Sequence, residues 1–154
     1  CAAQAAAHMT APERAALERL HAELAAAIHA GDEALYDCLD ERFHAAVNKG
    51  SHNDYLAELA ACTRAKLRPF LKDKYRGLER LAQSYAEHDR VLTAILRGER
   101  AEAGEAMRAH VLTTPVLAAH GLDVVLGGSV FPEPALAAAM EHPAHETPAG
   151  AALA

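Results

Sequence analysis

The feature that most constrains this chain is a pair of apolar helical faces, each with a histidine near its centre. Side chains three and four positions apart lie on one face of a helix, and apolar residues follow this spacing around His88 and again, after Gly98, around His110. Burying an imidazole is costly unless both ring nitrogens have partners. Two helices joined by a short glycine-containing turn pack antiparallel, so the two rings are predicted to meet. The two faces comprise Leu81, Tyr85, His88, Leu92 and Ile95, then Ala103, Ala106, Met107, His110 and Thr114.

The rest of the chain repeats the helical spacing. Thr10 and Glu13 form a capping-box pattern that begins a helix, Gly31 ends it, and Asp32 caps the next. The chain is rich in Ala and Leu and lacks Trp, which favours helix over sheet. We therefore predict an all-α fold, an antiparallel bundle of about six helices. The expected core faces of three upstream helices are Leu17, Leu20, Leu24 and Ile28; Leu35, Leu39, Phe43 and Val47; and Leu56, Leu59, Ala60, Thr63 and Leu67.

The bundle is predicted to occupy residues 1–128, which end at a Gly-Gly pair. Residues 129–154 are rich in Ala and Pro, and we expect a C-terminal extension that is flexible or docked on a partner subunit. Candidates for burial between subunits are Leu17, Leu20 and Leu24, or Phe131 and Leu136 of the extension.

Composition excludes several classes of protein. The net charge of −6 argues against direct DNA binding, which requires a basic face. The three cysteines show no Cys-x-x-Cys spacing and are interpreted as reduced thiols of a cytoplasmic protein. No apolar run approaches the ~20 residues of a membrane span, and the first residues lack the basic start of a signal peptide. Because the chain starts on Cys in a helical segment, we interpret it as a fragment.

A metal site is the most specific functional hypothesis that the sequence supports. Asp40 and His44 lie one helical turn apart, and with His88 and His110 they supply a carboxylate and three imidazoles from three helices. This ligand set suits zinc first, and also nickel, manganese or iron. Three core histidines without a metal are the simpler alternative.

A di-iron centre built from two Glu-x-x-His pairs is rejected. Those pairs begin at Glu18 and Glu41, and on the helix wheel both glutamates fall on the solvent side. A basic run separates the ligand helices. Within this run, Arg64 comes one residue after Thr63, which belongs to the apolar face of the helix. From this position its guanidinium could bind a carboxylate beside the metal through two hydrogen bonds.

Two stretches together resemble a known family. DERFHAAVNKGSHNDYLAEL followed by YAEHDRVLTAILRGERAEAGEAMRAHV is similar to the FCD-type ligand-binding domain of GntR-family transcription regulators, from Cys1 to about Thr114. In many members an Asp, the His four residues on, the His of a Glu-His pair and a final His bind one divalent metal. Those positions fall here on Asp40, His44, His88 and His110, and the family's Asn and Arg fall on Asn53 and Arg64.

The resemblance implies an all-helical homodimer that senses a small carboxylic acid. DNA would be bound by an N-terminal winged helix-turn-helix that this chain does not contain. We expect metal ligation by the four residues, and effector binding by Arg64, Asn53 and Tyr85. The alternative is a stand-alone metalloenzyme using the same metal, for which only Glu87 or Tyr85 offers an acid–base group nearby.

Overall fold

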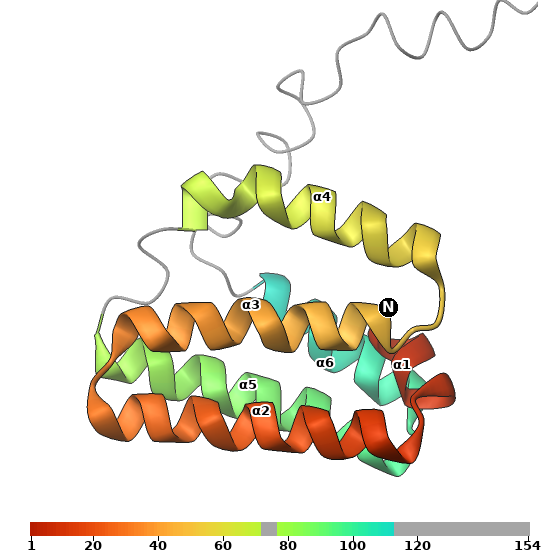
Figure 1. Cartoon of the computed structure of the whole chain (residues 1–154), viewed down its shortest axis with the longest axis horizontal. Coiled ribbons are helices and arrows are strands. Elements are labelled where there is room, and N and C mark those ends of the chain that lie inside the picture. Colours follow the sequence, from red (N-terminus) through yellow and green to blue (C-terminus); the bar gives the residue numbers. More distant parts are fainter. Residues whose placement is uncertain (72–76, 113–154) are drawn as a thin grey trace, which may run out of the picture. The chain divides into compact units, whose positions relative to one another are not determined.

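The computed structural model describes residues 1–71 and 77–112, which form six α-helices and no strand. The all-α prediction is therefore confirmed (Figure 1). All described residues lie within one compact unit. The predicted extension, residues 129–154, and the boundary before it lie outside the described part. The helices are α1 (Ala2–His8), α2 (Ala11–Ala30), α3 (Glu33–Lys49), α4 (Asp54–Leu71), α5 (Leu78–Arg97) and α6 (Arg100–Leu112).

The helix ends follow the local sequence signals. At the start of α2, the backbone N–H of Thr10 donates to Glu13 at 2.7 Å, which is half of the predicted capping box. Asp32 caps α3 by accepting the N–H of Leu35 at 2.9 Å. Gly31 and Gly98 adopt φ values of 67° and 73° after α2 and α5, a left-handed conformation that favours glycine. At both glycines the chain reverses its direction, so α2 packs against α3, and α5 packs against α6.

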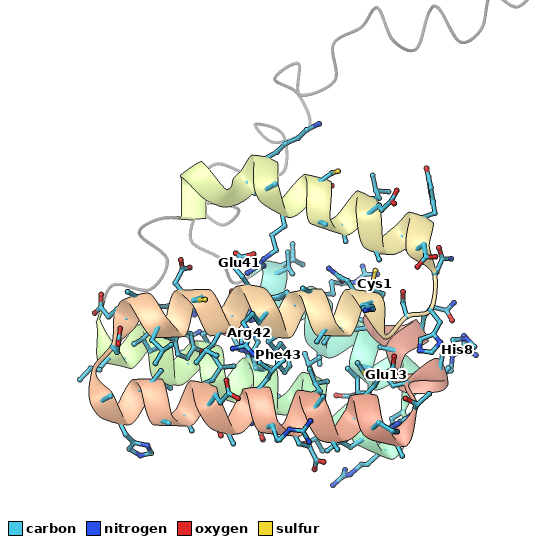
Figure 2. All side chains as sticks on the ribbon, viewed as in Figure 1. Cys1, His8, Glu13, Glu41, Arg42 and Phe43 are labelled. Carbon is cyan, nitrogen blue, oxygen red and sulfur yellow. The ribbon has the colours of Figure 1, made fainter. Side chains whose placement is uncertain are left out.

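The core lies between α1, α2, α3, α5 and α6. Tyr36 and Phe43 of α3 are fully buried, and Figure 2 shows Phe43 on the side of α3 that faces α2 and α5. Leu17 and Leu24 are also fully buried within this chain. They therefore belong to its own core, and the suggestion that they lie between subunits is wrong.

Helix α4 lies outside this core and packs mainly on α3 (Figure 1). Leu59 is 50% exposed and Thr63 is exposed, so the predicted core face of this helix is only partly covered. Leu35, at the start of α3, is likewise exposed. The periodicity identified residues that share a face, but α4 packs mainly on α3, which leaves Leu59 and Thr63 exposed. None of the described helices is both long and apolar enough to cross a membrane.

Candidate metal centre

Four side chains from α3, α5 and α6 converge in the bundle interior. Asp40, His44, His88 and His110 are all buried, and one potential ligand atom from each lies within 4.8 Å of the others. Nε2 of His110 lies 3.2 Å from Nε2 of His44 and 3.1 Å from Nε2 of His88. Oδ1 of Asp40 lies 3.2 Å from Nε2 of His88 and 3.8 Å from Nε2 of His44. The structure thus brings together the four residues that the sequence selected.

The local sequence explains why these side chains point inward. Asp40 and His44 are one turn apart on α3, on the same side as the buried Phe43. The ring of Phe43 stacks on that of His88, with centroids 4.6 Å apart. Apolar packing therefore fixes the orientation of one imidazole before any ligand is considered.

Hydrogen bonds among the three imidazoles cannot satisfy all of the ring nitrogens that meet here. Nδ1 of His110 lies 2.7 Å from Oε2 of Glu87, and a carboxylate accepts, so Nδ1 carries the proton and Nε2 presents a lone pair. Both His44 and His88 approach that single lone pair, which accepts one good hydrogen bond. A divalent cation would instead accept a lone pair from each of the three rings and one from Asp40. The donor set therefore fits a metal ion.

A second set of side chains orients the first. Arg64 of α4 donates through Nη2 to Oδ2 of Asp40 and through Nε to Glu41 at 2.9 Å, which leaves Oδ1 of Asp40 towards the histidines. Figure 2 shows Glu41 on the side of α3 that faces α4. The sequence placed both Glu18 and Glu41 on the solvent side. Glu18 is exposed, whereas Glu41 is only partly exposed and is bonded to Arg64 of α4. Arg64 thus connects α4 to the four-residue cluster through its ion pair with Asp40. That Arg64 also binds an effector stays a prediction.

The other two predicted effector residues have different surroundings. Asn53 is exposed, and its side-chain oxygen accepts the N–H of Leu56 at 3.0 Å, which caps α4. The ring of Tyr85 stacks on His21, with centroids 4.2 Å apart. Burial raises the pKa of Tyr85, and the charge of Asp89 adds to this.

Sequence reasoning missed two residues of this region. His21 is not among the predicted site residues, yet it is buried beside Tyr85 and Phe43. Its position four residues after Leu17, on the core face of α2, was the available signal. Glu87 was considered only as an acid–base group, although it is buried and bonded to His110. Its position next to His88 on α5 turns it about 100° towards α6, which could have revealed the pairing.

The Glu87–His110 contact leads to a first prediction. A carboxylate that accepts from a ligand histidine fixes the ring and raises its basicity, and loss of such partners typically costs 10–100-fold in metal affinity. We expect Glu87→Gln to weaken zinc binding by about that factor, measured by competition with a chromophoric chelator. Glu79→Gln, at an exposed position of the same helix, is the control. Equal affinities of the two variants would contradict the assigned contact.

The pKa of His44 leads to a second prediction. Burial lowers this pKa well below its usual value; Asp40 opposes the shift, whereas Arg64, His88 and His110 add to it. Burial also lowers the pKa of His21. As the pH falls below ~6.5, the unfolded chain therefore takes up protons that the folded metal-free protein does not.

The contribution of neutral His44 and His21 to the free energy of unfolding is thus complete above about pH 6.5. It is lost as the pH falls towards the lowered pKa values of these two histidines. Urea unfolding of chelator-treated protein should give a smaller free energy of unfolding at about pH 5.5 than at about pH 7.5. A value that is unchanged or larger at the lower pH would contradict this.

The fold and the site together define an all-helical domain with a buried group of four side chains that can hold a divalent cation. The family model described as the FCD domain matches residues 1–113. The chain belongs to this family, which is the C-terminal domain of GntR-family regulators. Neither the curated proteins nor the solved structures compared with the chain gave a match.

Proposed function

We propose that this chain is the effector-sensing and dimerisation domain of a GntR-family transcription regulator. In this proposal Asp40, His44, His88 and His110 bind one divalent metal, and a small organic acid binds beside it. The acid controls DNA binding by an N-terminal winged helix-turn-helix domain. The observation that carries the proposal is the convergence of these four side chains in the interior of an FCD domain.

The ligand set indicates zinc as the metal. Three imidazoles and one carboxylate are borderline ligands, and zinc binds such sets with nitrogen and oxygen distances of about 2.0–2.2 Å. Nickel, manganese and iron accept the same donors, so the identity is decided by elemental analysis. When bound, the cation supplies positive charge and open coordination positions to which an acid can bind.

The chain's own residues orient that site. Glu87 holds the proton on Nδ1 of His110, and Arg64 holds one oxygen of Asp40. An acid that reaches the metal would meet the guanidinium of Arg64 from α4. Because α4 packs mainly on α3, this contact offers a route by which the ligand shifts one helix relative to the others.

A metalloenzyme remains the alternative within this proposal. The FCD family is regulatory, and Glu87 is bonded to His110 while Tyr85 stacks on His21. Both nearby acid–base groups therefore have structural partners. Metal-dependent conversion of an added acid, followed by NMR, would favour the enzyme.

The sensing proposal predicts saturable stabilisation by small acids. At about 100 times the dissociation constant, a ligand adds about 2.7 kcal/mol, which raises the melting temperature of a domain of this size by several degrees. Malate, lactate and citrate should be compared by thermal melts with and without chelator, and removal of the metal should abolish the shift. Shifts of the same size in metal-free protein would contradict binding at the metal.

A dimer is part of the same proposal, since a regulator of two-fold operators communicates across a two-fold interface. Light scattering at tens of micromolar should give twice the mass of the chain. A monomer would count against the regulator.

A further inference from the structure

Helix α4 presents an exposed face on the side away from α3. Its partly exposed residues lie on the side that packs on α3, where Arg64 bonds with Asp40 and Glu41. The exposed side carries two large apolar side chains, since Tyr55 is 74% and Leu59 is 50% exposed. Exposed apolar side chains that gather on one face mark an interaction surface. The outer face of α4 is defined here by its exposed residues Tyr55, Glu58, Leu59, Ala61, Cys62, Ala65 and Lys66.

A ridge of three side chains runs along the outer face. Glu58, Cys62 and Lys66 follow one another at spacings of four residues, which form a continuous ridge on a helix surface. The ridge has opposite charges at its two ends and a small uncharged side chain at its centre. Side chains of one helix pair at spacings of three or four residues. Glu58 and Lys66, at twice that spacing and about 12 Å apart along the axis, therefore do not form such a pair within one chain.

This charge pattern is complementary to a second copy of itself. A two-fold axis perpendicular to a helix places the same helix of the partner subunit alongside it in the antiparallel direction. Residues at equal distances on opposite sides of the axis then meet. With the axis at Cys62, Glu58 of each chain lies opposite Lys66 of the partner subunit, because each is four residues from Cys62. Opposite charges in these positions favour association and fix the register.

The side chains around the ridge suit a helix pair. Axes of packed helices lie about 8–10 Å apart, depending on the side chains at the contact, and the small residues Ala61, Cys62 and Ala65 are at or beside the centre of the ridge. Tyr55 and Leu59 flank the ridge, and an antiparallel partner helix covers their exposed parts. Burial of this apolar surface stabilises the pair.

We propose that the outer face of α4 is the interface with a second copy of this chain, in which the two α4 helices run antiparallel across a two-fold axis near Cys62. The inference rests on the dimer of the proposed function and adds the surface and the register of that dimer. The opposite side of α4 bonds to Asp40 through Arg64, so this interface lies one helix away from the metal centre. A ligand that shifts α4 therefore changes the arrangement of the two subunits.

A charge-swap series tests the interface. Glu58→Lys sets two lysines opposite each other at both ends of the helix pair, and Lys66→Glu does the same with two glutamates. Each single variant should raise the dissociation constant of the dimer at least about 10-fold. The double variant E58K/K66E should bring it back to within about 3-fold of wild type, because the pairs form again with their signs exchanged.

Sedimentation velocity with fluorescence detection, from nanomolar to micromolar protein with zinc present, measures these dissociation constants. Both positions are exposed, and circular dichroism shows that each variant keeps its helices. Glu79→Lys, at an exposed position of α5, is the control and should leave the dimer unchanged. Since Glu58 and Lys66 do not pair within one chain, rescue by the double variant requires contact between chains.

Cysteine cross-linking tests the register without changing the charges. A disulfide requires Cα atoms within about 7 Å of each other, which residues close to the two-fold axis satisfy. In the variant Cys1→Ser/Cys38→Ser, oxidation with copper phenanthroline should link most chains into dimers through Cys62. The variant Cys1→Ser/Cys62→Ser keeps the exposed Cys38 of α3 and is the matched control, which should form far less linked dimer.

A dimer that the single variants leave unchanged, that the double variant does not restore, or whose Cys62 does not cross-link would overturn this interface, while the dimer and the regulator of the proposed function would stand. A wild-type monomer at tens of micromolar would overturn the interface and the dimer together. In such a monomer, slow modification of Cys62 by a maleimide would indicate that another part of the chain covers the outer face.

Discussion

Removal of the divalent cation should lower the melting temperature of this protein by about 10 °C or more. In the proposed site the cation would link α3, α5 and α6 through four buried side chains. Without it, the imidazoles of His44 and His88 compete for the single lone pair on Nε2 of His110. A ligand present at about 1,000 times its dissociation constant contributes about 4.1 kcal/mol, and for a domain of this size each kcal/mol corresponds to a few degrees.

The measurement is a pair of thermal melts, with excess zinc and with excess chelator, at the same pH and ionic strength. His110→Ala provides the control, because a protein that has lost the site should melt at one temperature under both conditions. A wild-type melting temperature that chelator does not change would contradict a structural contribution from the metal.

The second large effect is expected from His110→Ala itself. Nε2 of His110 is the atom closest to both other imidazoles, at 3.2 Å and 3.1 Å, and its ring is held by Glu87. Loss of this ligand should reduce metal affinity by more than the 10–100-fold that loss of an orienting partner costs.

Competition with a chromophoric chelator measures this affinity, and circular dichroism shows whether the variant keeps its helices. His29→Ala, at an exposed position of α2, is the matched control and should bind metal as wild type does. An affinity for His110→Ala that equals that of the control would show that His110 is not a ligand.

Much of the fold followed from local signals in the sequence. The ends of α2, α3 and α5 could be predicted because capping by Asp32 and left-handed turns at Gly31 and Gly98 depend only on neighbouring residues. The inward direction of His88 and His110 followed from helical spacing in the same way. These features need no knowledge of which helices are neighbours.

The partners across helices could not be predicted in this way. Periodicity gave Leu59 and Thr63 a place on the apolar face of α4, but it does not reveal that α4 packs mainly on α3. The pairing of Arg64 with Asp40 and that of Glu87 with His110 likewise depend on the relative placement of helices.

The measurement that tests the central claim most directly is native mass spectrometry combined with elemental analysis of protein purified without chelator. The account predicts about one divalent metal ion per chain, with zinc the principal element, and its absence from His110→Ala prepared in parallel. Wild-type protein without metal, both as purified and after incubation with zinc, nickel, manganese and iron, would contradict it.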